Sequence, residues 1–127
     1  MAYIYYNPNN RDRNDRGDCV VRALSKIMNQ SWDKTYLELC VQGYLMGEWG
    51  DSNEVWDSYL KGCGFVRRVI PNTCPNCYTI RDFCYDYPYG KYILATGSHV
   101  VAVKNGNYFD AWDSGNEVPI YFYERRS

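Results

Sequence analysis

The sequence HVVAVKNGNYFDAWDS, residues 99–114, holds two largely apolar runs separated by Asn105-Gly106. An Asn-Gly pair between such runs is a strong signal for a two-residue type I′ turn, because both residues accept a positive φ. We therefore predict a β-hairpin with strands over residues 100–103 and 108–112. His99, the only histidine in the chain, stands at the head of the first strand.

In the rest of the chain, turn residues and apolar patterning predict further strands over residues 2–6, 65–70, 92–95 and 120–123. Helical periodicity predicts helices over residues 19–28, 32–46, 53–62 and 80–85. Helices dominate the first half of the chain and a mostly antiparallel sheet dominates the second, which is typical of the α+β class. A length of 127 residues suits one domain, so we expect residues 1–127 to form a single α+β domain.

The first two helices carry apolar residues at helical spacing. The expected buried face of the first is made of Val20, Ala23, Leu24, Ile27 and Met28, with Asp18 as its N-cap. For the second, Ser31 is the expected N-cap and Gly47 the end. Its expected buried stripe is Leu37, Cys40, Val41, Tyr44 and Leu45.

The charge balance argues against a nucleic-acid partner. The chain has 14 basic and 15 acidic residues and a net charge of -1, so it lacks the basic excess that binds phosphate backbones. The opening MAYIYYNPNN lacks the basic and apolar regions of a signal peptide, and no apolar run has the length of a membrane span. We therefore expect a cytoplasmic protein with reduced thiols and no membrane partner.

Cys19 and His99 are the candidate nucleophile and base. Cys19 falls where the first helix begins, and the backbone N–H groups and dipole of a helix start favour a thiolate. A strand that faces this helix start can bring an imidazole to the thiol. The following strand then supplies an acid to orient the imidazole, for which Asp110 and Asp113 are the two candidates.

Hairpin register distinguishes these two acids. With Lys104 opposite Asn107, His99 falls opposite Trp112, so Asp110 is a diagonal neighbour on the same face. Asp113 lies one residue out of this register and requires a bulge or a strand end. Trp112 is predicted to lie in the core or to shield the bond between the imidazole and the acid.

The residues Gly-Asp-Cys-Val-Val-Arg-Ala at 17–23 resemble the nucleophile helix of papain-like cysteine peptidases. The segments over residues 99–103 and 108–114 resemble the histidine and Asn/Asp strands of that superfamily, which includes the bacteriocin-leader peptidases and the Josephin deubiquitinases. The whole chain also resembles small bacterial and phage proteins. The resemblance implies a papain-like α+β fold and a cysteine protease, a hydrolase that cleaves a peptide or isopeptide bond in a peptide or protein substrate through a Cys-His-Asp triad.

The resemblance favours Asp113 as the third member, because relatives carry Ser or Pro directly after it, as in Asp113-Ser114 here; Asp110 stays the close alternative. Relatives also have a glutamine about six residues before the nucleophile, where this chain has Arg13 and Asn14. Asn14 is either an amide donor to the oxyanion or a turn residue.

Two other functions remain open at this stage. Transglutaminase-like acyl transferases share the order Cys, His, Asp. A non-catalytic binding or inhibitor module could keep the same fold.

Six cysteines are present, and four of them could hold zinc: Cys63, Cys74, Cys77 and Cys84. Cys74-Pro75-Asn76-Cys77 is a single C-x-x-C, whereas structural zinc sites usually pair two such motifs. We expect these thiols to pack in a turn and in the core, with no metal and no cofactor.

Overall fold

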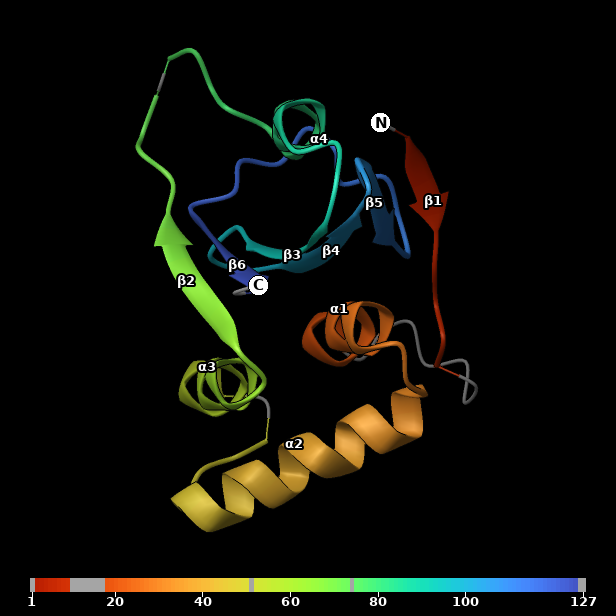
Figure 1. Cartoon of the computed structure of the whole chain (residues 1–127), viewed down its shortest axis with the longest axis vertical. Helices are drawn as coiled ribbons and strands as arrows, with labels where there is room; N and C mark the ends of the chain where they lie inside the picture. Colours follow the sequence, from red (N-terminus) through yellow and green to blue (C-terminus); the bar gives the residue numbers. More distant parts are fainter. Residues whose placement is uncertain (1, 10–17, 51, 74, 126–127) are drawn as a thin grey trace.

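The computed structural model describes residues 2–9, 18–50, 52–73 and 75–125. Within them, four helices and six strands form an α+β arrangement, as the sequence predicts (Figure 1). The elements are β1 (Tyr3–Tyr5), α1 (Cys19–Met28), α2 (Trp32–Met46), α3 (Asn53–Gly62), β2 (Phe65–Val69), α4 (Ile80–Asp86), β3 (Lys91–Ala95), β4 (Val100–Lys104), β5 (Asn107–Asp110) and β6 (Tyr121–Arg125).

The strands form one sheet in the order β1-β5-β4-β3-β6-β2. Only the β1–β5 pair is parallel; the others are antiparallel. The predicted hairpin is present: Lys104 pairs with Asn107, and Asn105 and Gly106 both adopt positive φ, at 51° and 78°. The Asn-Gly turn therefore sets the register of the strands that carry His99 and Asp110.

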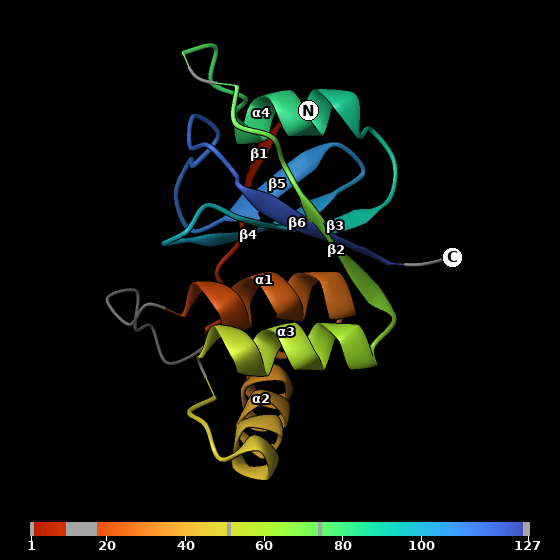
Figure 2. The same ribbon diagram turned by 90° about the vertical axis from the view of Figure 1, so that its left-hand side faces the viewer.

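Alternation along the strands divides the core between the two faces of the sheet. On one face, Ile93 and Ala102 pack with Leu24 and Ile27 of α1 and with residues of α3. On the other, Leu94, Val101 and Val103 pack against α4. Figure 2 shows the resulting order of layers: α4, the sheet, α1 with α3, and α2 outermost.

Helix α1 buries the predicted residues Ala23, Leu24 and Ile27, and it begins at Cys19 with Asp18 at the N-cap position, as predicted. The side chain of Asp18 makes no capping hydrogen bond and is instead paired with Arg22. A buried arginine one turn away is a stronger partner for the carboxylate than a backbone N–H, because its hydrogen bond is charge-assisted on both sides.

Helix α2 has the predicted bounds and the predicted Ser31 cap, but the expected buried stripe is wrong. Its buried residues are Thr35, Leu39 and Gly43, and most of the predicted stripe faces outward. Gly43 explains the choice of face: a Cβ there would lie 2.7 Å from the carbonyl oxygen of Glu48, so the turn after α2 packs directly on this small-residue side.

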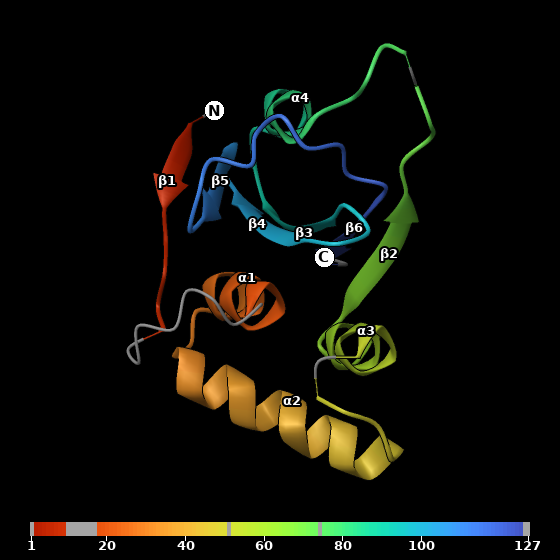
Figure 3. The same cartoon turned by 180° about the vertical axis from the view of Figure 1, so that it is seen from behind.

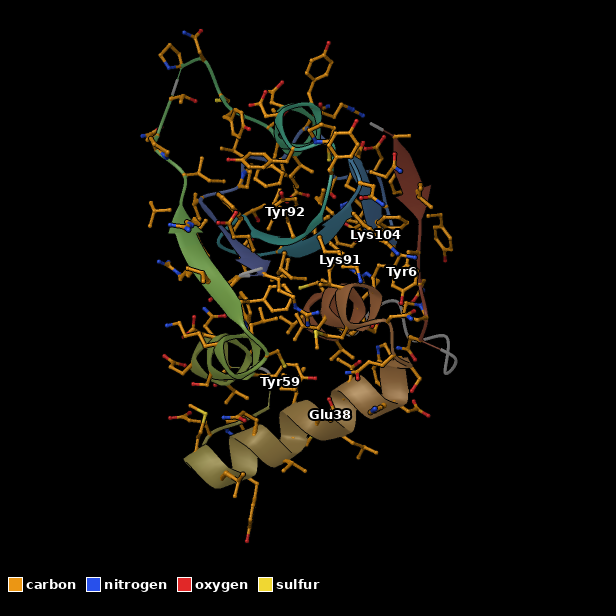
Figure 4. The ribbon with its side chains drawn as sticks, in the orientation of Figure 1. Tyr6, Glu38, Tyr59, Lys91, Tyr92 and Lys104 are labelled. Atoms are coloured by element: carbon orange, nitrogen blue, oxygen red, sulfur yellow. The ribbon has the colours of Figure 1, made fainter. Side chains whose placement is uncertain are left out.

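A polar cluster ties α2 to its neighbours. Tyr59 of α3 donates to Glu38 of α2, and the two side chains point toward each other in Figure 4. Gln30 donates to Tyr59 and to Glu38 as well. At the other side of the molecule, the hydroxyls of Tyr6 and Ser25 lie 2.9 Å apart and link the segment after β1 to α1.

In the part of the chain that the structure describes, no helix is both long enough and apolar enough to cross a membrane.

Candidate active site

Cys19 is the first residue of α1, and His99 directly precedes β4. Helix α1 lies across the face of the sheet below β4 (Figures 1 and 3), so the start of the helix meets the loop between β3 and β4. The Cys19 and His99 side chains lie beside each other, and both line an open pocket of about 190 Å³. The structure thus brings together the nucleophile and base that the sequence predicts.

The acid that contacts the imidazole is Asp110. His99 Nε2 lies 2.6 Å from Asp110 Oδ2, and both side chains are buried. Each ring nitrogen has one in-plane hydrogen-bonding position. Because Asp110 occupies the hydrogen-bonding position of Nε2, Nδ1 is the ring nitrogen left to face Cys19.

The carboxylate of Asp110 is held by three further groups. Ser114 Oγ donates to Oδ2 at 2.6 Å, the Ala111 N–H donates to Oδ1 at 2.8 Å, and Arg22 Nη2 donates to Oδ1 at 3.0 Å. Four partners on two oxygens leave the carboxylate little freedom to rotate. The imidazole it binds is therefore held in one orientation.

The charge states of the pair follow from these bonds. Burial works to lower the pKa of His99, but hydrogen bonds to Asp110 and Cys19 outweigh it and raise that pKa to about 9. Burial works to raise the pKa of Asp110, but hydrogen bonds from His99 and Ser114 hold it below its ordinary value. Both shifts favour an imidazolium beside a carboxylate.

Arg22 is a site residue that the sequence analysis did not single out. It is buried on α1, where Nη1 donates to Asp18 at 2.7 Å and Nη2 reaches Asp110. Asp18 also accepts from Trp32 Nε1 at 3.0 Å. The i,i+4 spacing of Asp18 and Arg22 was a visible signal of their pairing, but the link to Asp110, 88 residues away, comes only from the fold.

Trp112 follows β5 and covers the imidazole. Its ring stacks on His99 with centroids 4.3 Å apart and planes 25° apart, while about half of its surface stays exposed. The Arg22 guanidinium also lies over it, 5.7 Å from the ring centroid. Trp112 thus covers the buried ion pair and is not part of the core.

Asp113 lies elsewhere and corrects the preference that the resemblance gave. Its carboxylate accepts from Tyr108 Oη, and from Arg81 Nη2 at 3.1 and 3.3 Å, on the face of the sheet that carries α4. After β5 ends at Asp110, Trp112 and Ser114 lie on the side of His99, whereas the Asp113 side chain between them lies on the opposite side. The register argument, which favoured Asp110, gave the right contact.

The described lining of the pocket beside Cys19 is mostly uncharged. Its ionisable side chains are those of Cys19, His99 and Tyr121, and the other described lining residues are Val20, Asn53, Trp56, Ala95, Gly97, Ser98 and Val100. Trp56 Nε1 donates to Asn53 Oδ1 at 3.0 Å and so fixes the amide. Within the described part of the chain the Asn53 Nδ2 has no partner, which leaves it as a donor for a bound carbonyl.

Asn14, the expected oxyanion donor, lies outside the described residues, as does Cys74 of the zinc hypothesis. Cys63 packs with the core under α1 to α3, and Cys84 is buried on the opposite face of the sheet. A site that used both thiols is therefore not formed. Among the described residues no group of three or more His, Cys, Asp or Glu side chains could hold a metal ion.

Comparisons of this chain with protein-family models, with curated proteins and with solved structures found no match.

Proposed function

We propose that this protein is a cysteine-nucleophile hydrolase that cleaves an amide or isopeptide bond, with a papain-like arrangement of Cys19, His99 and Asp110. The observation that carries the proposal is the alignment of a thiol at a helix start, an imidazole beside it in the same pocket, and a buried carboxylate hydrogen-bonded to that imidazole. A nucleophile, a base in contact with it and a group that orients the base are the parts this chemistry requires.

The reaction begins from a thiolate–imidazolium pair, in which the proton of Cys19 Sγ has already passed to His99 Nδ1. The thiolate attacks the carbonyl carbon of the substrate, and the carbonyl π electrons move to its oxygen. Collapse of this intermediate expels the amine, which takes the proton from His99, and leaves a thioester on Cys19. Water then attacks the thioester with His99 as base, which releases the carboxylic acid and restores the thiol.

The developing oxyanion needs donors that are already in place. The backbone N–H of Cys19 belongs to the first turn of α1, where it has no partner within the helix. The side chain of Asn14 is the second donor proposed from the sequence. Asn53 Nδ2 supplies a further amide for a neighbouring carbonyl of the substrate.

Asp110 acts on the base rather than on the substrate. By binding Nε2 it turns Nδ1 toward Cys19, and its charge stabilises the imidazolium that forms when the thiol loses its proton. Arg22 and Ser114 hold the carboxylate for this role.

The substrate that suits the pocket is a peptide or protein tail whose residue beside the scissile bond is small and uncharged. Valine, alanine and tryptophan side chains form much of the walls, and among the described residues no lysine, arginine or carboxylate side chain lines the pocket. A thiol nucleophile has to stay reduced, and Cys19, Cys40, Cys63 and Cys84 are free thiols, which fits the proposed cytoplasmic location.

The test is the pH dependence of alkylation by iodoacetamide, followed for each cysteine by peptide mass spectrometry in the wild type and in His99→Ala. In the wild type we expect Cys19 to react well below pH 7, and in His99→Ala only as the pH approaches the range of an ordinary thiol, about 8.5. Cys40 in the same digest is the internal reference and should be unchanged. A Cys19 profile that is the same in both proteins would contradict the proposal and favour a binding module.

A further inference from the structure

The outward face of α2 carries an apolar surface with no covering element among the described residues. We define the α2 patch as Leu37, Val41, Tyr44 and Leu45, which follow one another at helical spacing, together with Trp49 just after the helix. Their exposed fractions are 62, 59, 84, 73 and 83%. Because these residues are rarely left in water as a group, a patch of this kind marks an interaction surface.

The position of α2 explains why this face is open. Helix α2 is the outermost layer and packs on α1 and α3 through Thr35, Leu39 and Gly43 (Figure 2). The Glu38–Tyr59 contact fixes this orientation, since Glu38 of α2 and Tyr59 of α3 point toward each other (Figure 4). The patch therefore cannot turn inward without breaking the polar cluster between α2 and α3.

We propose that the α2 patch is the interface of a homodimer, in which α2 crosses α2 of a second copy in antiparallel fashion about a two-fold axis at Val41. Self-complementarity supports this occupant. With Val41 on the axis, Leu37 faces Leu45 of the second copy and Leu45 faces its Leu37. One apolar stripe then covers the other along both halves of the helix.

Charge supports the antiparallel direction. Lys34 lies in the first turns of α2, with its side chain 63% exposed. The same crossing places it near the C-terminal end of the other α2, where Glu48 follows the helix and the last turn contains no basic residue. A cation is favoured at that end, because the helix dipole is negative there.

The exposed apolar area of the α2 patch is close to the area that a standard protein interface buries on each partner. Two large aromatic rings that are more than four-fifths exposed and three aliphatic side chains offer an apolar surface on the order of 700 Å² per copy, against about 800 Å² per partner in a standard interface. A lipid surface fits less well: α2 has one lysine against Asp33 and Glu38, whereas membrane-surface helices are rich in basic residues.

The dimer leaves the candidate active site open. The pocket lies on the sheet side of α1 and α3, whereas the α2 patch is on the side of α2 turned away from both. The inference therefore does not depend on the proposed function, and the two can fail separately.

The experiment is sedimentation velocity from about 1 to 100 µM on the full chain, with Val41→Glu as the disrupting variant and Val69→Glu as its control. Val69 is an equally exposed valine on β2, far from the α2 patch. We expect a concentration-dependent dimer for the wild type and for Val69→Glu. For Val41→Glu we expect the dissociation constant of the dimer to rise at least about tenfold, because two carboxylates would meet on the axis. Circular dichroism and unchanged Cys19 alkylation would show that Val41→Glu is folded.

Two further variants test the direction of the helices. Lys34→Glu and Glu48→Lys should each weaken the dimer, and the double variant should restore it, because the swapped charges attract again across the interface. In V41C, mild oxidation should join two copies through residue 41. A wild type that is monomeric over the whole range, a dimer that survives Val41→Glu, or a double variant weaker than both singles would overturn the proposal.

Discussion

Asp110, the last residue of β5, and Asp113, three residues further on, each form an ion pair with an arginine, and the two pairs differ in burial. In the Arg22–Asp110 pair the side chains are 5% and 1% exposed; in the Arg81–Asp113 pair they are 48% and 46% exposed. The donor–acceptor distances are almost equal, at 3.0 and 3.1 Å. Contact geometry therefore does not separate the two pairs, but burial does.

The difference teaches which acid can orient a base. A buried carboxylate keeps its charge only if bonded groups compensate for lost hydration, so Asp110 is surrounded by four donors. Asp113 remains partly hydrated, and its ion pair gains little in high dielectric. A carboxylate locked in place can hold an imidazole in one orientation, whereas a solvated one cannot.

The largest expected effect comes from the arginines. Arg22→Met leaves Asp18 and Asp110 buried without their shared cation, so we expect the free energy of unfolding to fall by about 3–5 kcal/mol. Arg81→Met, the matched change in the exposed pair, should alter it by no more than about 0.5 kcal/mol. Urea unfolding gives the free energy of unfolding of both variants. Equal decreases in the two would show that burial does not distinguish the pairs.

The next effect concerns the acids. Asp110→Asn keeps the shape but removes the charge that stabilises the imidazolium, so we expect the rate of Cys19 alkylation at pH 6.5 to fall about 10²-fold. Asp113→Asn should change it less than about twofold, because this side chain contacts Arg81 and Tyr108 instead. A larger fall in the alkylation rate for Asp113→Asn than for Asp110→Asn would favour Asp113 as the third member of the triad, as the resemblance did.

The smallest effect is a pH dependence of stability. The folded-state pKa of His99, about 9, exceeds the unfolded value of about 6.5. The stabilisation is therefore complete below about pH 6.5 and is lost as the pH rises to about 9, by an amount on the order of 1–3 kcal/mol.

This prediction is checked by urea unfolding at a series of pH values. His99→Gln should remove the loss between pH 6.5 and 9, and Cys19→Ala should retain most of it, because the bond to Asp110 remains. Asp113→Asn should leave the profile in this window unchanged. A wild-type profile that is flat from pH 6.5 to 9 would contradict the buried ion pair.

The sequence by itself determined the local structure and part of the site. The Asn105-Gly106 turn fixed the β4–β5 register, and that register pointed to Asp110 as the neighbour of His99. The Ser31 cap and the bounds of α2 were equally readable, because caps, turns and periodicity act over a few residues.

The tertiary structure alone decided what depended on burial. Helix α2 has apolar residues on two faces, and the close approach at Gly43, rather than hydropathy, determined which face became buried. The hydrogen bond of Arg22 to Asp110 joins residues 88 positions apart, so no local pattern could reveal it. Desolvation acts on groups brought together by the whole fold, and for this reason only the fold showed that the Asp110 pair is buried and the Asp113 pair exposed.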